Sequence, residues 1–530
     1  MKRRDFVGVL ALTSGAAAGA KMSLPVAASA FEVTEKTVAQ LQAAMQAGTV
    51  NAQQLVTLYL ARIAALDKAG PKLNSVIELN PDAMAIAKAL DIERKTKGPR
   101  GPLHGIPVLL KDNIATADGM QTTAGSLALV GAKPPRDAFL VTQLRQAGAV
   151  ILGKTNLSEW ANMRSTRSTS GWSARGGLTR NPYALDRNTS GSSSGSGSSM
   201  AASLAAIAVG TETDGSITSP ASIAGLVGIK PTLGLVSRAG VIPISHSQDT
   251  AGPMTRTVAD AAALLTALAG SDARDPATAL ANQKKTDYNK VLDRNALKGK
   301  RLGVVRGQWT ASSDIVAAAI ESQLAVLLAQ GAVLVDVPEV PNAAKYGESE
   351  LTVLLYELKA DMAAYLAEYA PTASVKNLAD LIAFNEKHRD KELSYFGQEH
   401  FINANSKGDL NTPEYKDALA NNHRYSRAEG IDQVLQEHKL DALVAPTGGT
   451  AWLTDFINGD AYGASFTSPA AVAGYPHITV PAGMVRGLPV GLSFVGTAWT
   501  EAPLIAMAYA YEQASLQRRA PSFAKSVNLT

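Results

Sequence analysis

Serine, glycine and lysine residues gather in three short stretches whose order could support acyl-transfer chemistry. Residues 190–199 read SGSSSGSGSS, and Ser216 follows Ser192 by 24 residues in a second glycine turn, TETDGSI. Upstream, Lys111 ends the apolar, β-like run in LHGIPVLLKDNI. A serine hydroxyl becomes a nucleophile only when a nearby base removes its proton, and a lysine whose charged form is disfavoured by burial can act as that base. These stretches are candidates for a hydrolytic active site.

Each stretch also has a simpler structural interpretation. Glycines and serines are typical of tight turns and linkers, but this cluster leads directly into an alanine-rich apolar segment, Met200 to Val209, whereas a linker would continue in low complexity. The pattern G-x-S-x-G from Gly191 to Gly195 would make Ser193 a nucleophile at a strand-to-helix elbow. The preceding YALDRNT is polar and turn-like, so it does not supply the strand that such an elbow needs.

Taken together, the stretches resemble the amidase signature family. The matching parts are Lys111 in KDN, the cluster with Ser192, and Ser216 in GTETDGSI. The similarity continues in PAS…GLVGIKPTLGLVS, DALVAPT and AGYPHITVPAG…GLPVGLSFVG, and so covers nearly all of the chain after residue 30. Within the family the chain is most similar to the peptide amidases, which share the Thr-Asp-Gly-Ser form. It has Asp214 where most members have glycine and Thr218 where many have arginine.

This resemblance implies a Ser-Ser-Lys triad and an α/β fold in which a single large domain holds a central mixed β-sheet flanked by helices. Lys111 would be the base, Ser192 a relay serine that follows a cis peptide bond from Gly191, and Ser216 the nucleophile that carries the acyl group. Backbone N–H groups around Thr213, Asp214 and Gly215 would stabilise the oxyanion. The resemblance implies neither a cofactor nor a metal, and the partner would be a peptide amide or a small-molecule amide.

Other catalytic patterns are weaker. The seven histidines follow no spacing typical of a metal site or a Ser-His-Asp triad, and packing is the preferred interpretation of His104 and His477, the two near the motifs. The absence of cysteine excludes a cysteine nucleophile and a cysteine zinc site. Residues 148–155, GAVILGKT, fit the P-loop pattern, but AVIL reads as a strand after a helix spanning 137–147, so we assign no nucleotide.

The first 30 residues resemble a twin-arginine export signal. RRDFV at residues 3–7 precedes a mild apolar run, and Ala28-Ser29-Ala30 offers a cleavage site. The mature protein would begin at Phe31 and lie in the periplasm or outside the cell, with no membrane anchor. The leader holds four basic residues against one acidic, so the rest of a chain of net charge +4 would carry +1. A nearly neutral protein has no electrostatic reason to bind nucleic acid.

Alternating helical and strand-like segments favour an α/β fold in a single catalytic domain, residues 31–530. Expected strands are Val76–Leu79, Val108–Leu110, Leu302–Val305 and Val333–Val337, and apolar stripes predict helices near residues 38–45 and 55–66. Ser219-Pro220 reads as the cap and first residue of a helix. The more charged, mostly helical segment from Ala343 to about Gly430 is expected to cover the site and help to choose the substrate.

The sequence thus predicts an exported serine amidase that releases ammonia from the C-terminal carboxamide of peptides. Two alternatives stay open. One is a broader aryl or aliphatic acylamidase of the same fold. The other is a periplasmic binding protein without turnover, for which the Lys111, Ser192 and Ser216 set would have no use. An amidotransferase component fits less well, because its charged tRNA would stay in the cytoplasm. The sequence does not indicate the oligomeric state.

Overall fold

The computed structural model describes residues 31–528. The predicted leader and its cleavage after Ala30 lie outside the described residues, and both stay predictions. From Val33 onward the chain forms one compact unit. Among the described residues, no helix is both long enough and apolar enough to cross a bilayer.

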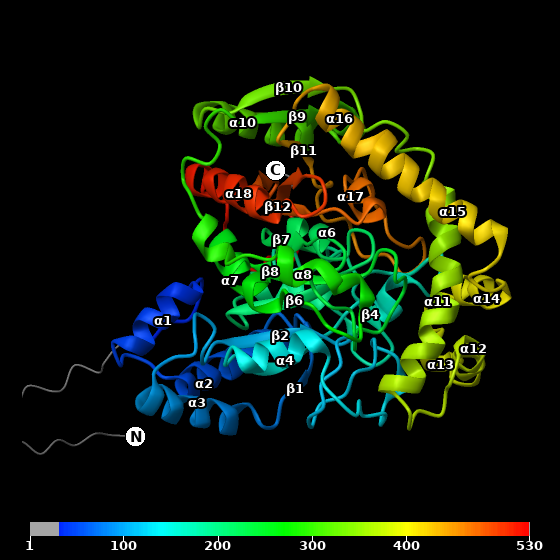
Figure 1. The fold of residues 1–530 in the computed structure, drawn as a ribbon. Helices are drawn as coiled ribbons and strands as arrows, with labels where there is room; N and C mark the ends of the chain where they lie inside the picture. The colour runs from blue at the N-terminus through cyan, green and yellow to red at the C-terminus, as the bar shows by residue number, and fades with distance from the viewer. Residues whose placement is uncertain (1–30, 529–530) are drawn as a thin grey trace, which may run out of the picture. The chain divides into compact units, whose positions relative to one another are not determined.

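A mixed sheet of eleven strands forms the centre of this unit (Figure 1). Its strands are β1 (Val76–Leu79), β2 (Pro107–Lys111), β3 (Val150–Thr155), β6 (Ile207–Glu212), β7 (Val227–Lys230), β8 (Thr250–Thr255), β9 (Arg301–Val305), β10 (Val333–Val337), β11 (Ala442–Pro446), β12 (His477–Val485) and β13 (Leu488–Val495). Their order is β1-β3-β2-β6-β8-β7-β12-β13-β11-β9-β10. β2 pairs in parallel with β3 and β6, and β9 with β10 and β11, whereas the other pairs are antiparallel. The prediction of a central mixed sheet is confirmed.

Helices cover the sheet and extend along one side of it. They are α1 (Val38–Gln46), α2 (Ala52–Arg62), α3 (Ala83–Lys97), α4 (Phe139–Gln146), α5 (Ser194–Ala201), α6 (Thr218–Ile223), α7 (Val258–Leu268), α8 (Ala281–Lys284), α9 (Arg306–Ala311), α10 (Asp314–Ala329), α11 (Gly347–Tyr369), α12 (Leu378–Lys387), α13 (Arg389–Glu392), α14 (Glu399–Ser406), α15 (Pro413–His423), α16 (Asp432–Glu437), α17 (Ser468–Ala473) and α18 (Glu501–Ser515). The long α11 packs against α14 and α15 (Figure 1), so the segment after residue 343 is mostly helical, as predicted.

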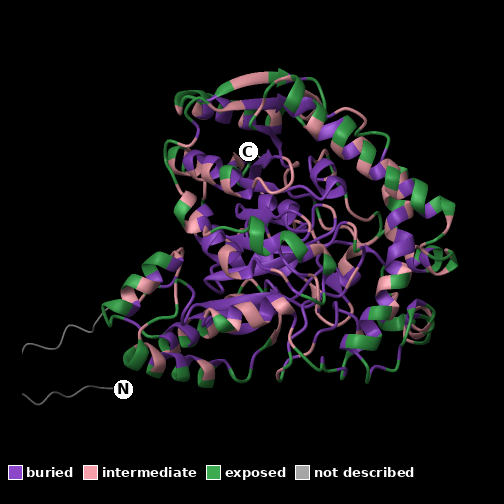
Figure 2. Ribbon diagram, viewed as in Figure 1, coloured by how far each residue is buried: buried purple, intermediate pink, exposed green. Residues whose placement is uncertain are grey.

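The middle of the sheet is buried on both faces. Every residue of β2, β3, β6, β7 and β8 is buried, and Figure 2 shows this centre as a continuous buried region. The edge strand β10 differs, since Val333 is 44% exposed. A strand covered on both faces needs apolar residues throughout, so a buried lysine at its end, such as Lys111 in β2, is a costly placement that needs compensating contacts.

The expected strands are present with small shifts at their ends. β1 and β10 have the predicted bounds, and β2 and β9 each extend beyond the predicted runs. α4 ends at Gln146, Gly148 takes a left-handed φ of 79°, and β3 then contains the Gly153-Lys154 pair. The supposed P-loop is therefore a helix-to-strand connection, as the sequence indicated.

The predicted start of the helix at Ser219 is wrong. α6 begins at Thr218, with Ile217 at the N-cap position, so Pro220 is its third residue. The reason is Glu212, whose buried carboxylate accepts hydrogen bonds from the N–H groups of Ile217 (2.7 Å) and Thr218 (2.9 Å). A carboxylate from another segment thus caps the helix, and the Ser219 side chain is left for other contacts.

The N-terminal helices pack as their apolar stripes predict. Val38, Leu41 and Met45 form the buried face of α1. Leu55 and Tyr59 are fully buried in α2, which continues as a π-helical turn over Ile63–Lys68. Stripes of this kind are core contacts and leave the chemistry to the loops at the strand ends.

Candidate active site

Lys111 ends β2 in the buried centre of the sheet, with no exposed surface. Its Nζ bonds to Ser192 Oγ (2.7 Å), to Thr211 Oγ1 (2.8 Å) and to the Thr211 carbonyl (3.2 Å). Burial lowers the pKa of Lys111 to about 7, although the charges of Asp249 and Glu212 act in the opposite direction. The amine is therefore partly neutral near pH 7 and lies within proton-transfer distance of a serine.

Ser192 is held in a tightly packed loop before α5. The peptide bond between Gly191 and Ser192 is cis, as the resemblance implied. The Ser192 carbonyl accepts a hydrogen bond from the N–H of Ser158 (3.1 Å). A Cβ at Gly191 would collide with the Ser158 side chain, and one at Gly195 would collide with backbone atoms of Asn156. Gly195 is required because the backbone of a neighbouring segment approaches too closely for any side chain, whereas a side chain at Gly191 would displace the Ser158 hydroxyl.

Ser216 lies beside this loop because the N–H of Ser193 donates to the Ser216 carbonyl (3.1 Å). That bond brings together two segments that are remote in sequence. Ser192 is fully buried, whereas Ser216 is 7% exposed and lines a cavity. Among the described residues no hydrogen bond joins the two serine hydroxyls. The direct Lys111–Ser192 contact is formed, and Ser216 follows the turn beside it and lines the cavity.

The turn that carries Ser216 presents its backbone to the same cavity. Gly215 has a left-handed φ of 76°, and a Cβ there would lie 3.0 Å from the Thr467 hydroxyl oxygen. The N–H groups of Asp214, Gly215 and Ser216 donate to no acceptor in the described part of the chain. Glu212 meanwhile accepts from the next two N–H groups, which fixes the turn. Unused donors on a rigid turn are what a developing oxyanion requires.

Thr213 lines the cavity, and its side chain also anchors the turn. Its hydroxyl donates to the Asp249 carboxylate (2.6 Å), which also accepts from the N–H groups of Ile244 and Ser245. Burial raises the pKa of Asp249 to about 6. The sequence analysis missed Asp249, because it lies 36 residues from Thr213 outside every matching motif.

A second residue that the sequence analysis missed, Glu350 of α11, lies against Asp214. The Asp214 carboxylate accepts from the hydroxyl of Ser468 (2.5 Å), and Gln248 Nε2 donates to Glu350 (2.9 Å). Burial raises the pKa of Glu350 well above its usual range, and the charge of Asp214 adds to this effect. Glu350 therefore keeps its proton and shares it with Asp214, so that two neighbouring carboxyl groups carry one negative charge.

The cavity in front of Ser216 has a volume of about 390 Å³. Hydroxyl groups dominate its lining, and Asp214 and Asp460 are its charged members; no lysine, arginine or histidine is among the described residues that line it. The lining residues are Ala161, Asn162, Met163, Ser165, Thr166, Ser168, Ser170, Gly191, Thr213, Asp214, Ser216, Ile244, Leu354, Asp460, Tyr462, Ser465, Thr467 and Ser468. Since Leu354 belongs to α11, the helical segment does contribute to the site, as expected.

The histidines play structural roles near the motifs, as predicted. His104 Nε2 bonds to the Leu90 carbonyl (2.9 Å), and His477 bonds to the Ser493 hydroxyl (2.6 Å). Burial lowers the pKa of His477 to about 3, so it stays neutral. Among the described residues, one group could offer three metal ligands, His246 with Glu357 and Asp361. These side chains already bond to one another, and none of them lines the cavity of Ser216.

Comparison with known proteins identifies the class. Residues 54–505 match the family model for Amidase, and the chain therefore belongs to the amidase family. It is an enzyme that hydrolyses amides.

Among solved structures, the native peptide amidase from Stenotrophomonas maltophilia is 54% identical with a TM-score of 0.89, and the alignment covers 92% of this chain and 99% of that one. A peptide amidase in complex with the inhibitor chymostatin gives 54% identity and a TM-score of 0.90 over 93% and 100% of the two chains. A probable amidase from Arabidopsis thaliana is 42% identical over 93% of each chain. A glutamyl-tRNA(Gln) amidotransferase component from Halorhodospira halophila is 35% identical over 90% of this chain and 97% of its own.

Proposed function

We propose that this amidase removes ammonia from the C-terminal carboxamide of peptides through an acyl-enzyme on Ser216. The observation that carries the catalytic part is the 2.7 Å bond between Lys111 Nζ and Ser192 Oγ, made by a buried amine whose pKa is lowered to about 7. The similarity to peptide amidases supports the choice of substrate.

Acylation begins with a two-step proton transfer. Neutral Lys111 accepts the proton of Ser192, and Ser192 takes the proton of Ser216 once the Ser216 side chain turns toward it. Ser216 Oγ then attacks the carboxamide carbon, and the carbonyl oxygen becomes an oxyanion that the free N–H groups of residues 214–216 stabilise. The relay returns a proton to the nitrogen as the carbon–nitrogen bond breaks, and ammonia leaves.

Deacylation reverses the roles of the attacking and leaving groups. A water molecule gives its proton to Ser192 and Lys111 while it attacks the ester carbon on Ser216. The second oxyanion collapses and releases the peptide as a free acid, and the proton returns to Ser216 Oγ. The hydroxyl-rich cavity suits this substrate, because hydroxyl groups both donate to and accept from peptide backbone groups.

Ammonia release tests the proposal directly. The substrates are C-terminally amidated peptides, small aliphatic amides and aryl amides, each with the parent enzyme and with Ser216→Ala. We expect release from the peptides that falls by at least about 10⁴-fold in the variant, as for loss of a serine nucleophile. Ser198→Ala is the matched control, because the Ser198 hydroxyl lies in the same cluster but donates only to the Arg180 carbonyl (2.8 Å).

The outcomes separate the alternatives. Release from small amides alone would favour the broader acylamidase and remove the peptide assignment. Full activity in Ser216→Ala would remove the nucleophile assignment. No release from any of these amides would remove both the peptide assignment and the broader acylamidase.

We also propose that the enzyme is exported and works outside the cytoplasm. The support is the twin-arginine pattern at residues 3–7 and the Ala28-Ser29-Ala30 site. N-terminal sequencing of protein from the periplasmic fraction should give Phe31 as the first residue, and replacement of both arginines by lysine should leave uncut protein in the cytoplasm. Uncut protein in the periplasm would contradict the cleavage site.

A further inference from the structure

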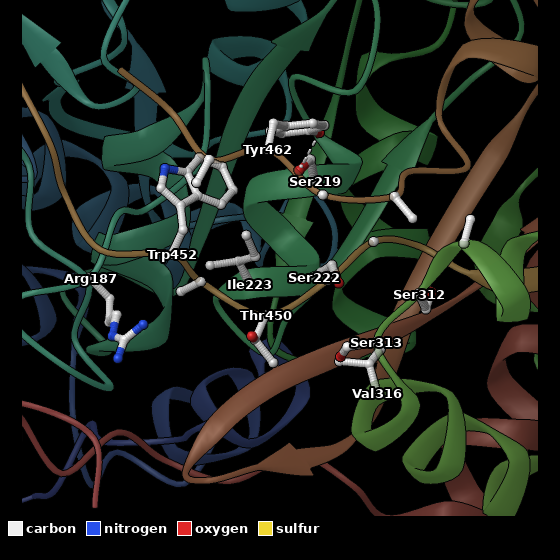
Figure 3. Close-up of a pocket in the computed structure, with 17 residues that line it drawn as sticks. Arg187, Ser219, Ser222, Ile223, Ser312, Ser313, Val316, Thr450, Trp452 and Tyr462 are labelled. Carbon is white, nitrogen blue, oxygen red and sulfur yellow. Dashed lines mark hydrogen bonds between the residues drawn. The ribbon is translucent and has the colours of Figure 1, made fainter. Parts of the chain in front are cut away.

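A second cavity, of about 310 Å³, is shown in Figure 3, and it shares the residue Tyr462 with the catalytic one. It lies between α6, the start of α10 and the glycine-containing loop that follows β11. Its inner wall is well packed, since Ile223, Val316 and Trp452 are each at most 9% exposed. This volume and lining are those of a small-ligand site.

Tyr462 connects the two cavities, because it lines both. Its hydroxyl donates to Ser219 Oγ (2.8 Å), and its ring meets Trp452 edge-on with 5.3 Å between ring centres. Figure 3 shows Tyr462 and Ser219 together at one end of the second cavity, joined by that bond. Tyr462 therefore lies at the boundary of the two cavities, and the proposal below requires that a substrate bound at Ser216 extends past it.

Arg187 gives the second cavity its charge, and its contacts are incomplete. Its side chain is only 18% exposed, yet its guanidinium donates no hydrogen bond within the described part of the chain, and its closest carboxylate, Asp186, is 3.7 Å from Nε. Arg518 is buried to a similar extent, with 16% of its side chain exposed, but its guanidinium is fully bonded. It contacts Glu35 (2.8 Å), Tyr183 and backbone carbonyls. The Nε of Arg187 is buried and makes no hydrogen bond, and the long ion pair with Asp186 leaves the guanidinium able to take a closer carboxylate.

The rest of the lining offers further donors and no competing acid. Neither Thr450 nor Ser313 uses its hydroxyl in a hydrogen bond among the described residues, and both line the cavity. Figure 3 shows Arg187 on the left, Ser313 with Val316 on the right, and Thr450 between them. No aspartate or glutamate lines this cavity, whereas Asp214 and Asp460 line the catalytic one. The two cavities thus carry opposite charge.

We propose that this second cavity binds a carboxylate on the acyl part of the substrate, so that the enzyme prefers peptide amides with an acidic side chain before the amidated residue. Arginine and carboxylate form paired, charge-assisted hydrogen bonds, and the Thr450 and Ser313 hydroxyls can donate to the same oxygens. This inference rests on the proposed function, because it requires a substrate that extends beyond Ser216.

The test uses N-acetylated tetrapeptide amides of alanine with glutamate or glutamine one, two or three residues before the amidated end. For at least one position we expect kcat/KM to be about tenfold higher with glutamate, mainly through a lower KM. Arg187→Gln should abolish this preference while it leaves kcat/KM for the glutamine peptides within about twofold. Arg180→Gln is the matched control, because Arg180 is exposed and lines neither cavity.

Thr450→Val is the second variant, in case Arg187→Gln lowers all activities by disturbing the fold. It removes only a hydroxyl and should reduce the glutamate preference about threefold. Equal rates for glutamate and glutamine at all three positions, or a preference that survives in Arg187→Gln, would overturn the inference and leave the proposed function intact. Failure of every peptide amide to react would overturn both.

Discussion

Two buried lysines on neighbouring strands show what separates a catalytic amine from a structural one. Lys111 ends β2, and Lys154 lies beside it in β3, where Thr155 pairs with Lys111. Both side chains are fully buried. Burial lowers the pKa of Lys111 to about 7 and that of Lys154 to about 8. Burial alone therefore does not distinguish them.

The contacts of the two amines differ. Lys111 Nζ faces the Ser192 and Thr211 hydroxyls at the edge of the catalytic cavity. Lys154 Nζ donates to the Ile114 carbonyl (2.6 Å) and the Thr122 hydroxyl (2.9 Å), and the charge of Asp112 favours its protonated form. A lowered pKa becomes useful chemistry only where a serine near the substrate is within reach.

The largest expected effect comes from Lys111→Met. General-base catalysis contributes about 10²–10⁴-fold, so kcat/KM for amide hydrolysis should fall by about 10³-fold. The measurement is initial-rate ammonia release, with circular dichroism to show that the variant is folded. A loss of less than tenfold would remove Lys111 from the role of base.

The pH dependence should follow Lys111 and not Lys154. Only neutral Lys111 accepts a proton, so kcat/KM should rise about tenfold per pH unit below about 7 and level off above it. Lys154→Met should leave this inflection in place. An inflection near pH 8 that disappears in Lys154→Met would assign the titration to Lys154. It would contradict the assignment of Lys111 as the base.

Thr211→Val should have an intermediate effect. The Thr211 hydroxyl accepts hydrogen bonds from Lys111 Nζ (2.8 Å) and Asn113 Nδ2 (2.9 Å), and valine has the same shape without the acceptor. Both hydrogen bonds are lost, and the loss of the one to Lys111, about 1 to 1.5 kcal/mol, should lower kcat about tenfold with little change in KM. Thr122→Val removes the corresponding contact of Lys154 and should change kcat by less than twofold.

Lys154→Met should affect stability and have the smallest effect on rate. It removes the shorter of the two hydrogen bonds to the buried Ile114 carbonyl and leaves only the 3.4 Å contact from the Thr122 hydroxyl, which costs about 1–3 kcal/mol in the free energy of unfolding. Urea denaturation measures this loss, and kcat/KM should stay within about threefold of the parent. A loss of activity as large as in Lys111→Met would show that the two amines form one functional unit.

The sequence pattern within a single segment was enough to predict that segment's local structure. The strand that ends at Lys111, the glycine-serine loop at Ser192 and the turn at Ser216 were all found where the sequence placed them. Each of these features depends on residues that are adjacent in the chain, so spacing carries the signal. Their catalytic roles stay part of the proposal above.

The contacts that cross between segments could not be predicted in this way. Glu350 reaches Asp214 from α11, and Glu212 caps α6 in place of the expected Ser219. Arg187 faces the second cavity only because the loop after β11 folds against it. These contacts depend on how distant segments pack together. No short pattern within one segment predicts which residues will meet.

The crowding at Gly191 and Gly195 has an evolutionary consequence. A Cβ at Gly195 would lie within 2.4 Å of backbone oxygens of Ser75 and Asn156, and one at Gly191 would displace the Ser158 hydroxyl, whether or not the enzyme turns over a substrate. A descendant that had lost catalysis would still have to keep Gly195 in order to fold. A glycine at position 195 therefore indicates common descent and a shared fold. The identities of residues 111, 192 and 216 are better indicators that a relative has retained activity.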